Sequence, residues 1–167
     1  MDSVTRASRK LAALIPPAVL LACSCAYSLR GNLPEHLQTV QIVPFRSSVT
    51  EYGLEQELTS LVVEEMVSNG RLAVVTDDAD AVLEGRITSF TRIPYSYTSA
   101  EEVEEYRLDV KVTLTFTDVV RNENILDTQS VGEWLIYDPS EEQYSDARQR
   151  LLVEAADEIV RSCLSGW

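Results

Sequence analysis

The chain has 167 residues, of which 45% are hydrophobic and 25% are charged, ordinary values for one globular domain that exclude wholesale disorder and a membrane protein with several spans. Acidic residues outnumber basic ones by 27 to 14, for a formal net charge of -13. Since a nucleic-acid binder neutralises phosphates with a basic face, this balance argues against nucleic acid as a partner.

Residues 1–24 are predicted to be a lipoprotein signal peptide. Arg6, Arg9 and Lys10 form a basic amino-terminal region, and an apolar stretch follows at residues 11–22. This stretch is too short to span a bilayer as a stable anchor, but it fits a secretory signal. It ends in LLACSC, where a small residue precedes a cysteine as in the lipobox of bacterial lipoproteins.

Two cysteines, Cys23 and Cys25, are the candidates for lipidation, and cleavage is expected just before one of them. Cys23 has the better local sequence, with Leu20 three positions and Ala22 one position before it. Two or three acyl chains would hold the protein stably on a membrane, since each buried methylene contributes roughly 0.8 kcal/mol. Neither cysteine is followed by Asp, a cue for inner-membrane retention in many lipoproteins, so we expect the outer membrane.

The first part of the mature chain is predicted to form a strand, a helix and a second long strand. Residues 37–45 (LQTVQIVPF) contain several β-branched residues and alternate in polarity around Val40 and Ile42, which indicates a strand. Apolar residues then recur every three and four positions over residues 50–69, and an Asn-Gly pair ends this predicted helix. A short apolar run at residues 71–75 is a candidate strand, and residues 81–93 form a longer one after an acidic turn.

The second part is predicted to form a loop, a hairpin and a helix. Residues 95–105 are a polar loop, and residues 106–117 then alternate in polarity without a break, so one face of that strand is buried and the other is wet. An antiparallel partner follows at residues 125–137, with Gly132 as a candidate bulge. The second helix is expected at residues 140–164, capped by its first residue, a serine.

This order of elements indicates one α+β domain over residues 25–167. We expect a two-layer sandwich in which two helices pack on one face of a mixed four-stranded sheet. No internal repeat, low-complexity tract or linker divides the chain.

The sequence contains no pattern typical of catalysis, a cofactor or a metal. It has no glycine-rich phosphate loop, no paired-histidine zinc helix and no glycine-flanked nucleophilic serine. His36 has no evident partner and is predicted to be a solvated loop side chain. The carboxylates at residues 101–105 lack the spacing of a calcium loop and are predicted to be a charged turn. Cys163 is predicted to be a buried thiol, with a disulfide to an amino-terminal cysteine as the alternative.

A polar sheet face remains as the candidate functional surface. Its members on the long strand are Arg107, Lys111, Thr113, Thr115 and Thr117, with Arg92 and Arg121 expected near strand ends. A surface of this kind acts by docking into a partner and filling or positioning it. Because the chain is so acidic, it repels anionic surfaces unless its few arginines are grouped.

Several segments resemble the LptE family of lipopolysaccharide-assembly lipoproteins. The chain has Cys-Ala-Tyr at residues 25–27, where that family commonly begins its mature part with Cys-Gly-Tyr. It has a helix after its first strand, and it matches the family's Ala-Asp-x-x-Leu-x-Gly segment at residues 79–85. In motifs and element order the resemblance covers nearly the whole chain, roughly residues 23–165.

The resemblance implies a non-enzymatic outer-membrane lipoprotein that plugs the lumen of the LptD β-barrel, helps to assemble it and passes lipopolysaccharide to the outer leaflet. Such a protein is lipid-anchored and faces the periplasm or lies inside the barrel lumen. The family's register favours Cys25 for lipidation, whereas the local sequence favours Cys23, and both stay open. Family members are thought to contact lipopolysaccharide phosphates through basic side chains. By position, the candidates for that contact are Arg92, Arg107, Lys111 and Arg121.

An alternative interpretation is a different envelope lipoprotein that binds or activates a periplasmic enzyme or a secretion pore. Other envelope lipoproteins have segments similar to residues 79–85, which are weakly specific alone. Co-purification separates the two interpretations, since a large outer-membrane barrel supports the first and cell-wall synthases support the second.

Overall fold

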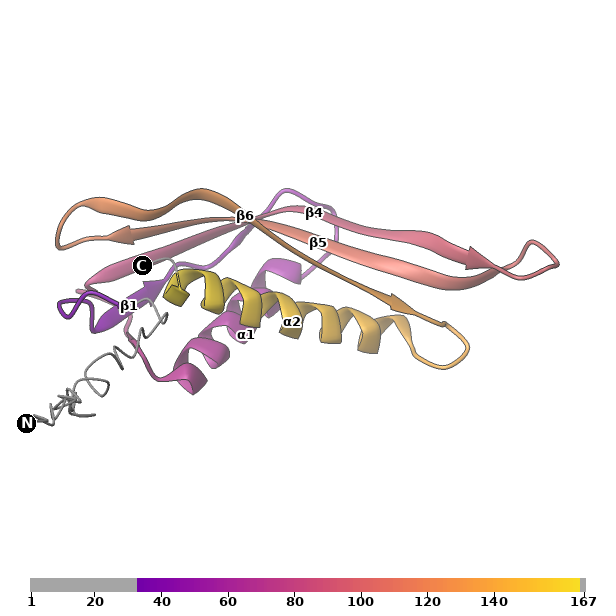
Figure 1. Ribbon diagram of the computed structural model, residues 1–167, viewed down its shortest axis with the longest axis horizontal. Helices are drawn as coiled ribbons and strands as arrows, with labels where there is room; N and C mark the ends of the chain where they lie inside the picture. Colours follow the sequence, from indigo (N-terminus) through magenta and orange to yellow (C-terminus); the bar gives the residue numbers. More distant parts are fainter. Residues whose placement is uncertain (1–32, 166–167) are drawn as a thin grey trace, which may run out of the picture.

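The computed structural model describes residues 33–165, which form a mixed six-stranded sheet with two helices against one face (Figure 1). The strands are β1 (Thr39–Ile42), β2 (Arg46–Ser47), β3 (Ala73–Val74), β4 (Ala81–Tyr97), β5 (Val103–Asp118) and β6 (Glu123–Tyr137). The helices are α1 (Leu54–Asn69) and α2 (Tyr144–Ser165). The predicted α+β class is confirmed, although the sheet has six strands rather than four because β2 and β3 are two-residue strands at its margin.

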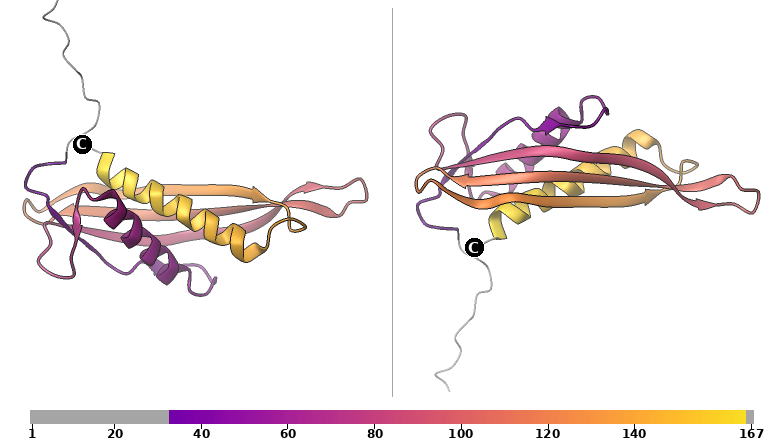
Figure 2. Two further views of the ribbon diagram at one scale, coloured as in Figure 1. Left: turned by 90° about the horizontal axis from the view of Figure 1, so that it is seen from below. Right: turned by 90° about the horizontal axis from the view of Figure 1, so that it is seen from above.

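The strand order is β3-β1-β4-β5-β6, and β2 also pairs with β4. β1 runs parallel to β3 and β4, whereas β4, β5 and β6 form an antiparallel meander. The first strand is shorter than the predicted 37–45, because the chain leaves β1 at Ile42 and pairs with β4 again only at β2. Figure 2 shows α1 and α2 side by side on one face of the sheet and no helix on the other. We call these the inner and the outer face.

The inner face and the two helices enclose the core. Every second residue of β5 points into it, as the unbroken alternation predicts, and Phe116 is fully buried. The helices meet it with buried residues at helical spacing, which are Leu54, Leu58, Val62 and Met66 on α1 and Ala147, Leu151, Ala155 and Ile159 among those on α2.

A glycine flanks α1 at each end. The helix begins at Leu54, later than residue 50, because Gly53 takes a left-handed conformation (φ 74°) and no side chain caps the first turn. The predicted end at Asn69-Gly70 is confirmed. Gly70 is also left-handed (φ 70°), and its N–H donates to the Met66 carbonyl over 3.3 Å.

The predicted polar loop at residues 95–105 is mostly strand. β4 continues to Tyr97 and β5 begins at Val103, so the β4–β5 hairpin projects beyond the helices (Figure 1). Both faces of this projecting ribbon meet solvent, which removes the polar–apolar alternation that identifies a half-buried strand. The turn closes through the Thr98 N–H, which donates to the Glu102 carbonyl over 2.8 Å.

The predicted bulge at Gly132 is wrong. Gly132 pairs in regular register with Lys111, and the register shifts instead where β6 passes Leu114 to Thr117 of β5. Thr128, in that stretch of β6, has a positive φ of 54°. The extra residues therefore lie at a polar segment whose local sequence gives no glycine signal.

The predicted cap at Ser140 is also wrong, since α2 begins at Tyr144. The Ser140 N–H donates to Asp138 Oδ1 over 2.7 Å, and the Glu142 N–H donates to the Asp138 carbonyl over 2.9 Å. These bonds hold residues 138–142 in a turn, so Ser140 belongs to the connection before the helix.

Candidate functional site

The outer face of the sheet presents the polar side chains of β5. Because the even-numbered residues of this strand from Leu108 to Asp118 are buried on the inner side, the odd-numbered ones point the other way. They are Arg107, Asp109, Lys111, Thr113, Thr115 and Thr117. The predicted polar surface of the long strand therefore forms one continuous face without a helix over it (Figure 2).

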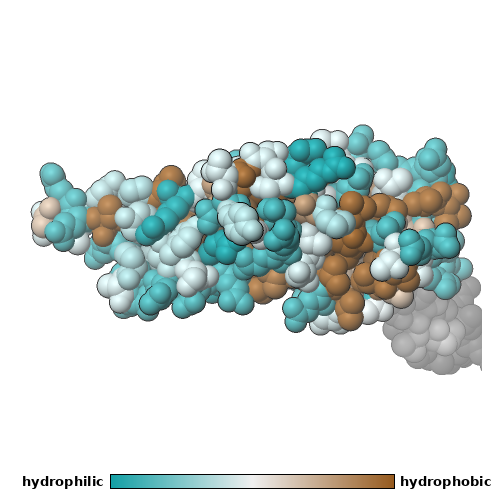
Figure 3. All heavy atoms as spheres, turned by 180° about the vertical axis from the view of Figure 1, so that it is seen from behind, coloured by the Kyte–Doolittle hydropathy of each residue, from teal (hydrophilic) through white to brown (hydrophobic). Residues whose placement is uncertain are grey.

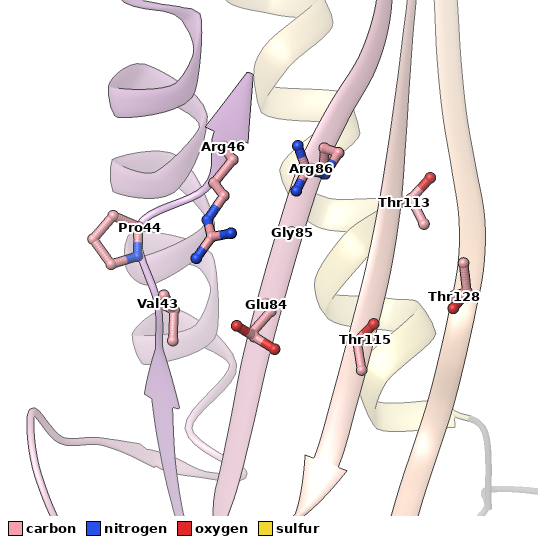
Figure 4. Close-up of a pocket in the computed structure, with 9 residues that line it drawn as sticks. All are labelled: Val43, Pro44, Arg46, Glu84, Gly85, Arg86, Thr113, Thr115 and Thr128. Atoms are coloured by element: carbon pink, nitrogen blue, oxygen red, sulfur yellow. The ribbon is translucent and has the colours of Figure 1, made fainter. Parts of the chain in front are cut away.

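A hollow of about 390 Å³ lies on this face where β2 joins β4. Its lining residues are Val43, Pro44, Arg46, Glu84, Gly85, Arg86, Thr113, Thr115 and Thr128. Figure 4 shows the labelled side chains in front of the sheet, with the helices behind it. Arg46 and Arg86 are register partners on parallel strands, and Thr113 of β5 pairs with Arg86. We call this feature the arginine hollow.

Arg46, Arg86 and Lys111 concentrate positive charge on the outer face. Among residues 33–165, none of these three side chains has an ion pair or a hydrogen bond. On α2, by contrast, Arg148 pairs with Glu57 at 2.8 Å and Arg150 pairs with Glu142 at 2.6 Å. The outer face thus carries three basic side chains without an ion-pair partner in a chain that is acidic as a whole.

Arg107 lies on the outer face but is already engaged. Its Nη2 is 2.5 Å from Asp109 Oδ1, and its guanidinium carbon lies 4.5 Å from the centre of the Trp134 ring. Trp134 is 52% exposed and Ile93, the register partner of Arg107, is 48% exposed. This end of the outer face therefore combines a neutralised charge with exposed apolar surface.

Arg92 stands on the inner side of the sheet, beyond the core, among tyrosines. Its guanidinium carbon lies 3.7 Å from the ring centre of Tyr106, and the rings of Tyr137 and Tyr144 lie within 5.4 Å. The Tyr144 hydroxyl donates to Glu51 Oε1 over 2.9 Å, and burial together with this bond raises the pKa of Tyr144 to about 12. Arg92 therefore joins β4 to the start of α2.

Arg121 lies at the opposite end of the sheet, in the β5–β6 turn. Its backbone N–H donates to Asp118 Oδ1 over 2.9 Å, while His36 Nε2 lies 2.6 Å from Asp118 Oδ2. The prediction that His36 has no partner is therefore wrong, because its partner is 82 residues away in the sequence. Burial raises the pKa of Asp118, but the hydrogen bonds from Arg121 and His36 outweigh it and hold the pKa below its ordinary value.

The structure does not gather the four predicted lipopolysaccharide contacts into one cluster. Arg107 and Lys111 share the outer face, Arg92 belongs to the inner side, and Arg121 lies at the far turn. Sequence reasoning missed Arg46 and Arg86, which lie together only because β2 runs parallel to β4. The one local signal was the alternation of Glu84 and Arg86 with buried residues along β4.

The Ala-Asp-x-x-Leu-x-Gly segment has a structural role. Asp80 Oδ2 accepts hydrogen bonds from the Gln38 and Thr39 N–H groups and from the Thr39 hydroxyl, all within 3.0 Å. These bonds lower the pKa of Asp80 and fix the start of β1 beside β4. Leu83 is fully buried, and a Cβ on Gly85 would lie 2.6 Å from the Phe45 ring.

The described residues provide no further reactive centre. Cys163 is a buried free thiol, as predicted, and burial raises its pKa to about 12. No group of three or more His, Cys, Asp or Glu side chains within residues 33–165 is arranged to hold a metal ion. In the same range, no helix is long and apolar enough to cross a membrane. The predicted signal peptide, Cys23 and Cys25 lie outside the described residues.

Exposed apolar residues gather at the ends of the molecule. On the side shown in Figure 3, hydrophobic atoms concentrate toward the end beside the grey residues, and much of the remaining surface is hydrophilic. Val119 and Val120, in the β5–β6 turn, are 50% and 61% exposed, and Tyr95 and Tyr97 on the opposite hairpin are 55% and 58% exposed. The arginine hollow lies between these two apolar ends.

Solved structures of several bacterial proteins share this fold. Rare lipoprotein B from Shewanella oneidensis is 24% identical, with a TM-score of 0.51 over 73% of this chain and 92% of that chain. A protein from Xanthomonas campestris is 12% identical, with a TM-score of 0.58 over 80% of this chain and 87% of that chain. An uncharacterised lipoprotein B from Nitrosomonas europaea is 17% identical, with a TM-score of 0.50 over 84% of this chain and 94% of that chain.

The family comparison covers almost the whole described fold. None of the curated proteins matches this chain. The family model LptE, described as lipopolysaccharide-assembly, matches residues 37–163, from the loop before β1 to the last turn of α2. The chain therefore belongs to the LptE family of lipopolysaccharide-assembly proteins.

Proposed function

We propose that this protein is an outer-membrane lipoprotein that occupies the lumen of an LptD-like β-barrel, supports its assembly and takes part in moving lipopolysaccharide to the outer leaflet. The observation that carries the proposal is the family match over residues 37–163. The protein acts by binding and positioning, without catalysis. Lipidation at Cys25 or Cys23 attaches it to the membrane, and cleavage before that cysteine removes the signal peptide.

The shape of the fold supports a plug. The antiparallel meander of β4, β5 and β6 forms a long ribbon (Figure 1). Polar residues line its outer face, and apolar residues are exposed at both hairpins. A barrel lumen is polar and wet, so a ribbon with a polar face fits it better than a lipid environment. The exposed Trp134 and Tyr97 are residue types that commonly anchor protein interfaces.

Co-purification tests the proposal directly. The full-length protein, extracted from its own bacterium in mild detergent, is expected to purify with a large outer-membrane β-barrel. Recovery of the protein alone, or with cell-wall synthases, contradicts the barrel partnership and favours the alternative envelope lipoprotein. Mass spectrometry of the mature amino terminus, in the wild type and in Cys23→Ala and Cys25→Ala variants, identifies the lipidated residue.

Direct contact with lipopolysaccharide is a separate part of the proposal. Arg107 and Lys111 are the predicted contact residues that lie on the outer face, whereas Arg92 and Arg121 lie elsewhere. Binding that a chelator abolishes supports bridging by divalent cations. Binding that resists the chelator but is lost in Lys111→Gln supports direct contact by the side chain.

A further inference from the structure

The two margins of the sheet differ in how much backbone they leave unpaired. At one margin β3 has 2 residues, whereas β6 at the other margin has 15. Among residues 33–165, no strand pairs with the far side of β6, and Figure 2 shows this strand in orange along the edge of the sheet. A long open edge presents N–H and C=O groups that can pair with another chain, and proteins commonly shorten or cover such edges. The β6 edge is therefore a candidate docking surface.

The backbone groups that face away from the sheet belong to alternate residues of β6. The Lys111 carbonyl accepts a hydrogen bond from the Thr88 hydroxyl of β4 over 3.2 Å, so the backbone groups of Lys111 point toward β4. In an antiparallel pair these directions alternate along the strand. Gly132, the register partner of Lys111, therefore directs its N–H and C=O away from β5, as do Trp134 and Ile136. Within residues 33–165, none of these three forms a backbone hydrogen bond beyond the edge.

The inner side of this edge is acidic. Glu133 is the register partner of the buried Val110, so its side chain points to the inner face. Burial there, together with the nearby Glu154 and Glu158 of α2, raises the pKa of Glu133. Arg161 also acts on Glu133, but its guanidinium is already paired with two carboxylates of α2. Negative charge therefore exceeds positive charge beside the edge, and an incoming lysine or arginine would offset it.

The outer side of the same edge is apolar. Trp134 and Ile136 are register partners of Asp109 and Arg107, which lie on the outer face, so their side chains share that face. Trp134 is 52% exposed, and the Arg107 guanidinium stacked on its ring is already paired with Asp109. Exposed aromatic rings commonly anchor protein interfaces. Because side chains of a strand alternate between two faces, every second residue of an added strand would meet this apolar side and the others would meet the acidic side.

We propose that the β6 edge binds an extended segment of another protein, in which lysine or arginine alternates with apolar residues. The segment pairs with the backbone groups of Gly132, Trp134 and Ile136, and its basic side chains lie beside Glu133. A second copy of this chain fits less well, because antiparallel pairing of two β6 edges places both Glu133 carboxylates on one face, in chains that each have a net charge of -13. The inference goes beyond the proposed function, and its test contains no barrel.

Amide exchange along β6 tests the proposal. The probe is a peptide of alternating lysine and valine, blocked at both ends and about seven residues long, a usual length for a strand. The comparison peptide has glutamate in place of lysine. Each peptide is added to the purified full-length protein in mild detergent, and NMR follows both binding and amide exchange. The lysine peptide is expected to slow exchange at Gly132, Trp134 and Ile136 at least about tenfold, because these amides gain hydrogen bonds. The amides of Val131 and Leu135, which face β5, are expected to change little.

Two pairs of variants separate backbone pairing from charge. Gly132→Pro removes an outward N–H, whereas Gly132→Ala also adds a Cβ but keeps that N–H, so the proline variant should bind the lysine peptide at least about tenfold more weakly. Glu133→Gln with Glu154→Gln is expected to weaken binding about fivefold and to reduce its dependence on salt. Glu101→Gln with Glu102→Gln removes the same charge from the β4–β5 turn and should bind within about twofold of the wild type. Circular dichroism verifies that each variant is folded.

Each outcome supports the proposal or overturns it. Protection at alternate amides of β6 with the lysine peptide, and none with the glutamate peptide, supports it. No binding of the lysine peptide overturns it, as does binding that leaves these amides unprotected. Protection that rises with protein concentration in the absence of peptide shows that a second copy occupies the edge, and the proposal is then wrong. If Gly132→Pro does not fold, amide exchange in the wild type and binding by the Glu133/Glu154 variant decide the matter. Failure to co-purify with a barrel contradicts the proposed function and leaves these results unchanged.

Discussion

On β5, neighbouring residues meet opposite environments, since Phe116 is fully buried beneath the helices while Thr115 lines the arginine hollow on the outer face. The inner face is specified by packing, and its side chains interlock with α1 and α2. The outer face has hydroxyls and uncompensated arginines, which contribute little to folding. The protein can therefore use its outer face for recognition without loss of stability, and four predictions test this division.

The largest expected difference is between two neighbouring residues of β5. Phe116→Ala is expected to lower the free energy of unfolding by about 3–5 kcal/mol, because it opens a cavity in a closed core. Thr115→Ala, one position along, is expected to change it by less than about 0.5 kcal/mol. Urea denaturation with a common slope measures both values. Equal losses in the two variants would show that Thr115 contributes as much to stability as the buried Phe116, which contradicts the division between the two faces.

The buried Asp118 is expected to make stability depend on pH. Asp118→Asn removes charge-assisted hydrogen bonds with His36 and with the Arg121 N–H, and is expected to lower the free energy of unfolding by about 1–3 kcal/mol at neutral pH. Because the folded pKa lies below the ordinary 3.8, the stabilisation is complete above 3.8 and is lost as the pH falls through the folded pKa.

The measurement for Asp118 is denaturation at neutral pH and again in acid below the folded pKa, where the wild type and the variant should converge. Asp127→Asn is the matched control, since Asp127 is exposed on β6 and accepts a hydrogen bond from the hydroxyl of its neighbour Thr128. A gap between wild type and Asp118→Asn that persists unchanged into acid would contradict the assignment.

Gly85 is expected to be required by packing on the inner face. A Cβ at this position would lie 2.6 Å from the Phe45 ring, so Gly85→Ala is expected to cost about 1–3 kcal/mol. Gly132→Ala is the control, since its Cβ would point to the outer face with a nearest neighbour at 3.2 Å, and a smaller loss is expected. Thermal unfolding compares the two. Combining Gly85→Ala with Phe45→Leu should cost less than the sum of the single changes.

The smallest expected effect has the opposite sign. Burial, reinforced by Glu158 and Glu154 on α2, raises the pKa of Glu133, so its ionised form is disfavoured in the folded state. Stability is therefore lost as the pH rises from the ordinary 4.5 through the folded pKa. Glu133→Gln should stabilise the protein by less than about 1 kcal/mol at neutral pH and have no effect well below 4.5. The exposed Glu123→Gln serves as the control in the same denaturation series.

Much of the fold was predictable because it depends on local periodicity. The unbroken alternation at residues 106–117 identified both the strand and its buried face, and the spacing of apolar residues identified both helices. The errors lie where local patterns carry no information. The projecting ribbon at residues 95–105 has solvent on both faces, so its polarity does not alternate. The Ser140 N–H donates to Asp138 within a turn before α2, and this turn depends on the path of the chain rather than on the local pattern.

By itself, the sequence determined the class of the fold, the wet and dry sides of its longest strands and, through its motifs, its family. Tertiary structure alone decided which charged groups meet. His36 reaches Asp118 across 82 positions, and Arg46 meets Arg86 because β2 lies parallel to β4. Periodicity is a property of neighbours along the chain, whereas pairing between distant residues follows from strand order and register, which no local pattern encodes.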